Sequence, residues 1–357
     1  MLTWMVFGAG LFVGLIAGLN AYGLLTYNIN TSLLQSQQES WDSCESMLTR
    51  AKTGTSLQHN MTDTELFCRA LAVSSGEEIV SEPKISFLFL VNDNLPLLPL
   101  WEKFFSGHQG LYSIYVHSIH ARSWNLNASS VFYARTIPSR VVEWGRISMV
   151  DAEKRLVANA LLDVSNKHFV LLSESCIPLY NFTTVYNYLI SSNLSHVESY
   201  DNPGRRSRGR YNKFMAPQIT LSHWRKGSQW FEIQRPLAQI FIADNKYYLV
   251  FKRFCKPTCY PDEHYLPTLL NIFDQGSLNS NRSLTWVDWT KLSPHPAQFK
   301  KNQITQQFLQ KIHDDGISSN CTNESQPATS IYFLFARKFH PSSLEPLLAI
   351  SSRVMGF

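Results

Sequence analysis

The chain has 357 residues, of which 44% are hydrophobic, and a formal net charge of +5 at pH 7. This length and apolar content suffice for one large domain or two ordinary ones with a buried core. Only 17% of the residues are charged, which excludes a dedicated nucleic-acid-binding protein but is compatible with a basic pocket for an anionic ligand.

The N-terminal segment is apolar enough to enter a membrane. Residues 4–25 form an almost unbroken hydrophobic run, and no charged residue precedes Glu39. A run of this length can cross a bilayer. Because it is longer than a usual signal-peptide core and a polar segment follows, we expect an uncleaved signal anchor over residues 1–25. A signal peptide cleaved near the small residues 21–23 is the alternative, and no flanking Lys or Arg sets the orientation.

Glycosylation sequons and cysteines favour a lumenal or extracellular body. Eight Asn-x-Ser/Thr triplets without a central proline begin at Asn30, Asn60, Asn127, Asn181, Asn193, Asn281, Asn320 and Asn323. The six cysteines permit up to three disulfides in an oxidising compartment, in pairs that the sequence does not identify. A zinc site at Cys255 and Cys259 is not favoured, because no second Cys/His pair stands at ligand spacing.

The first half of the chain alternates between strand and helix patterns. Residues 26–83 are polar and are expected to form a stem with some helix near 62–72. After it come apolar strand runs and helical patterns, in the order strand 85–91, helix 96–107, strand 111–117, strand 141–145, helix 148–166 and strand 168–174. This alternation predicts βαβ units with a parallel sheet covered on both faces. We expect one α/β domain over residues 84–357.

The second half is less regular. It contains a basic cluster at 205–213, a Gly-Ser turn at Gly227 and Ser228, a Trp-rich loop at 284–296 and an apolar strand run that ends in Arg337 and Lys338. The basic cluster could bind nucleic acid or anionic lipid, but a solvated loop or one that positions a substrate fits the pattern better.

Two adjacent carboxylates follow a Cys-x3-Cys segment in the stretch FCKPTCYPDEHYLPTLL. One interpretation is helix capping, because Pro261, Asp262 and Glu263 would occupy the first turn of a helix, where acids complement exposed N–H groups. The other is that one carboxylate is a catalytic base at the mouth of a cleft. The pattern by itself leaves both open.

Common phosphate-binding and nucleophile motifs are absent. The sequence contains no GxGxxG, no GxxxxGK[ST], no GxSxG and no Asp-x-Asp. If the protein binds a sugar nucleotide, basic side chains must meet the diphosphate, and Arg337 and Lys338 are candidates, although a solvated strand end would look the same. Trp286 and Trp289 could be core residues or could stack on sugar rings.

Several segments resemble a known family. The segment of residues 85–117, together with LLSESCIPLYN, KGSQWF, RFCKPTCYPDEHYLPTLL and FLFARKF, is similar to the plant branch of the core-2/I-branching β-1,6-N-acetylglucosaminyltransferases, glycosyltransferase family 14. The resemblance covers residue 85 to the C-terminus and not the stem. It implies a GT-A-like Rossmann-type fold, with a mixed sheet flanked by helices, and a type II Golgi membrane protein. It also implies a metal-independent, inverting transfer from UDP-N-acetylglucosamine to a glycan or glycoprotein, without a cofactor.

The resemblance also assigns residues. The family's catalytic base falls on Glu263, its donor-diphosphate cation on Lys338, with Arg337 adjacent, and its Gly-Ser turn beside the acceptor on Gly227 and Ser228. An Arg-Tyr pair before this turn matches Arg210 and Tyr211, and we add Trp286 as an acceptor contact. Asp262 is then expected to cap the helix.

Two departures bear on the donor. Animal members carry an Asp where this chain has His117, and their second phosphate-binding arginine has no clear match near 295–301. A single carboxylate suffices for an inverting transfer, whereas a glycosidase needs two across the scissile bond. A secretory-pathway protein that keeps the fold and binds glycans without turnover is the alternative.

Overall fold

A computed structural model of the protein describes Cys44 and residues 57–73, 82–120, 124–256, 259–290, 295–320 and 331–357. The expected membrane anchor at residues 1–25 and much of the stem lie outside these ranges. Among the helices in the described ranges, none is long and apolar enough to cross a membrane.

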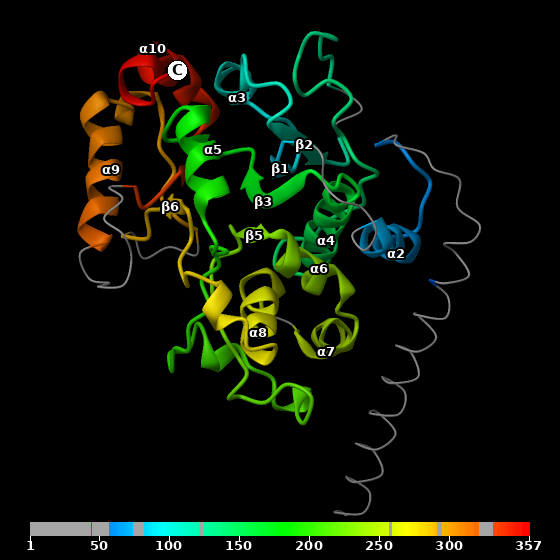
Figure 1. Ribbon diagram of the computed structural model, residues 1–357. Coiled ribbons are helices and arrows are strands. Elements are labelled where there is room, and N and C mark those ends of the chain that lie inside the picture. The colour runs from blue at the N-terminus through cyan, green and yellow to red at the C-terminus, as the bar shows by residue number, and fades with distance from the viewer. Residues whose placement is uncertain are drawn as a thin grey trace, which may run out of the picture.

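The central sheet is a mixed sheet of four strands in the order β2-β1-β3-β5 (Figure 1). Strands β1 (Lys84–Leu90), β2 (Tyr112–His117) and β3 (Asn166–Ser173) are parallel, and β5 (Glu232–Gln234) runs antiparallel to β3. The three parallel strands confirm the predicted strands 85–91, 111–117 and 168–174 to within two residues. The predicted α/β class with a mixed sheet is therefore confirmed, although no sequence pattern indicated which segment would form the antiparallel edge strand.

A second sheet of three short strands lies beside the first. Its order is β4-β7-β6, with β4 (Ile177–Pro178) antiparallel to β7 (Phe335–Arg337), and β7 parallel to β6 (Thr285–Val287). This sheet brings the C-terminal part of the chain next to the end of β3.

Helices cover both faces of the central sheet, as the near-continuous apolar strands require. One core includes Phe169, Leu171 and Phe231 and is covered by α2 (Asp63–Val73), α4 (Ile147–Leu161), α6 (Arg235–Ala243), α7 (Lys246–Phe254) and α8 (Tyr265–Ile272). The other includes Phe87, Trp101 and Phe335 and is covered by α3 (Leu98–Phe105), α5 (Phe182–Ser191), α9 (Gln306–Asn320) and α10 (Leu344–Val354).

Helix α2 falls in the stretch expected to be stem, yet it packs on the domain. Leu66 and Ala70 are buried in the first core, and the Asp63 carboxylate receives two hydrogen bonds of 2.8 Å from the buried Arg155 guanidinium of α4. A disulfide joins Cys68 of this helix to Cys44. The described part of the stem is thus attached to the α/β domain by packing, charge and a covalent link.

Two predicted elements differ in the structure. The prediction of a strand at 141–145 is wrong. The segment is an irregular loop in which Val141 and Trp144 are 70% and 59% exposed. The helix expected at 148–166 ends at Leu161, and Asn166 already begins β3.

Candidate active site

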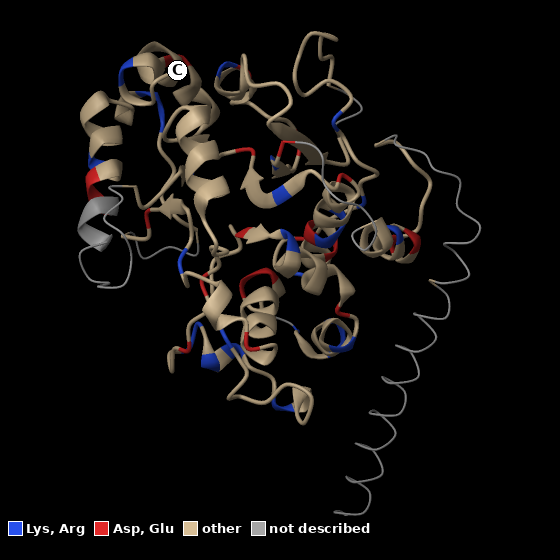
Figure 2. Ribbon diagram, viewed as in Figure 1, with Lys and Arg blue, Asp and Glu red and all other residues tan. Residues whose placement is uncertain are grey.

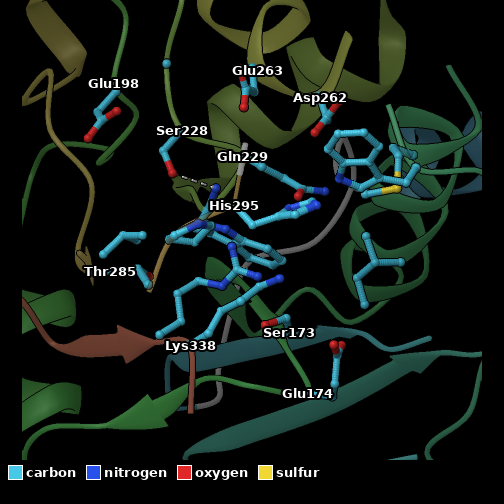
Figure 3. A pocket seen from close by; sticks show the side chains of 18 of the residues that line it. Ser173, Glu174, Glu198, Ser228, Gln229, Asp262, Glu263, Thr285, His295 and Lys338 are labelled. Atoms are coloured by element: carbon cyan, nitrogen blue, oxygen red, sulfur yellow. Dashed lines mark hydrogen bonds between the residues drawn. The ribbon is translucent and has the colours of Figure 1, made fainter. Parts of the chain in front are cut away.

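A cavity of about 880 Å³ opens at the carboxyl ends of the parallel strands, where open α/β sheets bind their ligands. Residues that end β1, β2, β3 and β7 line it, together with the turn before α8. Its charged lining comprises Arg140, Lys226, Arg282, Arg337, Lys338, Glu174, Glu198, Asp262 and Glu263. Figure 3 shows Glu263 and Lys338 on opposite sides of this cavity.

The acidic turn is a 3-10 helix, Pro261–Glu263, that leads directly into α8. Tyr260 before it has a left-handed backbone, with φ of +55°, and the disulfide Cys255–Cys259 closes the preceding loop. The Tyr260 ring stacks on the Arg210 guanidinium, with 4.3 Å between the guanidinium carbon and the ring centre. The turn is therefore held from both sides.

Glu263 faces two cations through one carboxylate oxygen. Its Oε2 lies 2.5 Å from Arg210 Nη1 and 2.9 Å from Lys226 Nζ, while Oε1 accepts no hydrogen bond from the described residues. Burial acts to raise the pKa of Glu263, but Lys226 and Arg210 outweigh it and hold that pKa below its usual value. The carboxylate is thus ionised at neutral pH, oriented through Oε2 and open through Oε1.

Gly227 supports the same turn by a close backbone approach. Its N–H donates to the Glu263 carbonyl at 2.9 Å. A Cβ at this position would lie 1.9 Å from the Glu198 carbonyl oxygen, so only glycine fits. Ser228 lines the cavity, and its Oγ accepts from the Trp230 N–H at 3.2 Å. The Gly-Ser turn therefore lies at the site, next to Glu263.

Asp262 differs sharply from Glu263. Its Oδ1 is buried without a hydrogen-bond partner in the described structure, and neither the 3-10 helix nor α8 has a side-chain cap. The expectation that Asp262 caps the helix is therefore wrong. Burial, and then the charge of Glu263, raise the pKa of Asp262 to about 7. Asp262 in turn adds to the effect of burial on Glu153 of α4, whose pKa is raised well above its usual value.

Arg337 and Lys338 form the basic wall opposite Glu263. Arg337 ends β7, Lys338 follows it, and both line the cavity. The Arg337 guanidinium lies 4.0 Å from the centre of the Trp230 ring, and its Nε is buried with no hydrogen-bond partner among the described residues. Burial lowers the pKa of Lys338, and the neighbouring charge of Arg337 lowers it further. Two neighbouring cations in the wall of a cavity can bind an anionic group such as a phosphate.

The remaining predicted acceptor-binding residues, Arg210, Tyr211 and Trp286, are not gathered in one place. Arg210 reaches Glu263, as described above. Tyr211 does not line the cavity; its hydroxyl donates to the Ile219 carbonyl and its ring contacts Trp224. Trp286 packs against Phe299 and Phe308 and does not line the cavity.

Two residues at the site, Glu198 and Arg282, were not anticipated, and a third, His117, was noted only as a departure from the animal members of the family. Glu198 lies in the cavity, and burial raises its pKa against the charge of Lys226. Arg282 is buried and donates to the Tyr332 carbonyl and the Tyr188 hydroxyl. His117 ends β2, and burial lowers its pKa to about 4, so that its imidazole is neutral at pH 7. No motif marks these residues, because only the fold brings them together.

The sequons divide by exposure. Asn60, Asn127, Asn193 and Asn281 are exposed, and Asn281 lies at the cavity. Asn181 is half-buried and caps α5 by accepting from the Thr184 N–H at 2.8 Å. Asn30 and Asn323 lie outside the described residues, and the structure describes no side chain for Asn320. The described part of the chain contains no group of three or more His, Cys, Asp or Glu placed to hold a metal.

Comparisons with known proteins agree with this geometry. The family model for the Core-2/I-Branching enzyme matches residues 85–313. A rice protein (Oryza sativa subsp. japonica) named Glycosyltransferase BC10 is 34% identical over 329 residues, which cover 79% of this chain and 81% of the rice protein. The match spans the parallel strands, the Gly-Ser turn and the acidic turn. The chain is therefore a glycosyltransferase of the Core-2/I-Branching enzyme family.

Proposed function

We propose that this enzyme transfers N-acetylglucosamine from UDP-N-acetylglucosamine to a hydroxyl of a glycan or glycoprotein, with inversion and without a divalent metal. The observation that carries the proposal is the division of the cavity into two walls. Glu263 presents an open, ionised carboxylate oxygen on one side, and Arg337 and Lys338 present cations on the other.

The chemistry follows from these two walls. The acceptor hydroxyl attacks the anomeric carbon of the sugar as the bond to UDP breaks, and Glu263 Oε1 takes the hydroxyl proton. General-base catalysis of this kind contributes about 10²- to 10⁴-fold. UDP leaves with the bonding electrons, and Arg337 and Lys338 stabilise the charge that develops on its phosphate. UDP leaves as an anion, so no second carboxylate is needed to protonate it.

Arg210 and Lys226 orient the base. Both hold Oε2, with side chains that are each 18% exposed, so they fix the carboxylate while Oε1 stays free for the acceptor. Their charges keep Glu263 ionised before the hydroxyl binds. The acceptor therefore occupies the space beside Glu263, and the UDP moiety lies toward Lys338, in a GT-A-like arrangement.

The proposal extends to the compartment. The apolar run at residues 4–25 and the exposed sequons support a type II Golgi membrane protein with a lumenal catalytic domain. Mass spectrometry of the mature N-terminus tests the anchor, because a chain that begins near residue 24 would instead be a secreted product.

The test of function is a transfer assay on the purified full chain. With UDP-N-acetylglucosamine and a mixture of plant-type glycan acceptors, we expect UDP release and a labelled product, both unchanged by EDTA. UDP release that EDTA abolishes and manganese restores would contradict the metal-independent mechanism. Glycan binding without release of UDP from any UDP-sugar would identify a binding protein instead.

A further inference from the structure

The basic residues of the chain are concentrated beside the site. Residues 202–231 contain seven of its 32 Lys and Arg residues and none of its 27 Asp and Glu residues. The rest of the chain therefore has 25 basic and 27 acidic residues and is slightly acidic. The positive net charge of the whole protein resides in this one segment, and Figure 2 shows its basic residues on the loops below α8.

The segment is joined to the cavity on the side of Glu263. Tyr200 and Lys226, which line the cavity, bond to each other through both backbone N–H groups at 2.9 Å. Arg210 reaches Glu263 from the same segment. The loop between them is anchored, because the buried Trp224 donates through its indole N–H to the Ser207 carbonyl at 3.1 Å. The loop is thus fixed to the wall of the site that carries Glu263.

Some of these cations have acidic partners and others have none. Arg210 and Lys226 hold Glu263, and Arg208 forms a bidentate pair with Asp201. In contrast, Arg205, Arg206 and Lys213 are exposed and form no ion pair with the described acids. Lys213 lies 5.6 Å from the ring centre of its neighbour Phe214, which is 65% exposed.

We infer that this basic loop, residues 205–213, binds acceptor glycans that carry carboxylate groups. The inference rests on the proposed function, in which the acceptor occupies the space beside Glu263. A uronic acid beyond the reacting sugar offers a carboxylate to Arg205, Arg206 or Lys213, and the guanidinium groups can receive it in a bidentate manner. The exposed ring of Phe214 offers an apolar face to a sugar. The loop would therefore select acidic glycan chains and hold them on the side of the site that carries Glu263.

Direct binding tests the loop without relying on turnover. An oligogalacturonide and the same oligosaccharide with its carboxyl groups reduced to alcohols are titrated into the full chain by calorimetry. We expect the acidic form to bind at least tenfold more tightly, with an affinity that falls as salt rises. The triple variant Arg205→Gln, Arg206→Gln, Lys213→Gln should lose about tenfold of that affinity.

A charge-matched control removes three exposed cations elsewhere, in Lys300→Gln, Lys311→Gln, Arg353→Gln. It should bind the acidic oligosaccharide like the wild type. The inference would be overturned if both triple variants lost the same affinity for the acidic oligosaccharide, or if the reduced oligosaccharide bound as tightly as the acidic one. It would also be overturned if the loop bound phosphatidylserine vesicles or single-stranded DNA more tightly than the acidic oligosaccharide. UDP release in the presence of a small neutral galactoside should be the same in the wild type and both variants. If the wild type releases no UDP, the proposed function fails, whatever the oligogalacturonide shows.

Discussion

The buried Asp262 carboxyl should make the protein less stable as the pH rises, and Asp262→Asn should remove that effect. The folded state raises the pKa of Asp262 from 3.8 to about 7, so between these values the folded state binds more protons than the unfolded state. The free energy of unfolding then decreases with rising pH. About three pKa units at 1.36 kcal/mol each set an upper bound of about 4 kcal/mol for this penalty above pH 7.

The assay is thermal unfolding of the wild type and Asp262→Asn from about pH 3 to pH 8. The variant should match the wild type at about pH 3, below the unfolded-state pKa of Asp262, and become progressively more stable than it toward pH 7, because an amide carries no charge to bury. Asp163→Asn is a control of opposite sign. Hydrogen bonds from Lys84 and Ser165 outweigh burial and lower the pKa of Asp163, so this variant should lose stability at neutral pH. An Asp262→Asn protein less stable than the wild type at pH 8 would refute the reasoning, since it would mean that the carboxylate has a favourable partner.

Two further substitutions test the walls of the cavity. Lys338→Ala should weaken UDP binding about 10- to 100-fold, because a hydrogen bond to a charged group typically contributes that much affinity. The control Lys300→Ala, which removes an exposed cation outside the cavity, should leave UDP binding unchanged. Equal dissociation constants for the two variants in calorimetry would show that Lys338 does not bind the donor. Gly227→Ala should destabilise the fold by about 2 kcal/mol or more and abolish transfer, because its Cβ would meet the Glu198 carbonyl. Gly276→Ala, where the added Cβ meets nothing within 4 Å, is the matched control, and similar unfolding midpoints for the two alanine variants would contradict the close approach.

The sequence predicted the part of the fold that local pattern determines. Strands β1, β2 and β3 are long apolar runs whose side chains are buried on both faces, so their residue types reveal them. The segment 141–145 has the same apolar character but forms a loop at the rim of the cavity, where Trp144 contacts Tyr260 and His295. Strands β5, β6 and β7 have three residues each, too short for any periodic signal.

The site was predictable where a segment resembles the family. The local pattern left the roles of Glu263 and Lys338 open, and the resemblance assigned them together with Gly227; all three line the cavity. The prediction that Trp286 contacts the acceptor shows where sequence reasoning stops, because alternate residues of a strand point to opposite faces and the sequence does not show which face lines the cavity. Thr285 and Val287 of β6 face the cavity, and Trp286 between them packs away from it. Glu198 and Arg282 have no local signal, since their positions depend on contacts between distant segments.

The central claim is that Glu263 removes the proton from the acceptor hydroxyl. Glu263→Gln keeps the size of the side chain but cannot accept that proton at neutral pH. The most direct measurement is therefore the rate of sugar transfer from UDP-N-acetylglucosamine by this variant, together with the affinity of the same preparation for UDP. We expect transfer to fall by about two to four orders of magnitude, while the dissociation constant of UDP stays near the wild-type value because Lys338 and Arg337 are untouched. A Glu263→Gln enzyme that transfers sugar within a few-fold of the wild-type rate would contradict the assignment of Glu263 as the base.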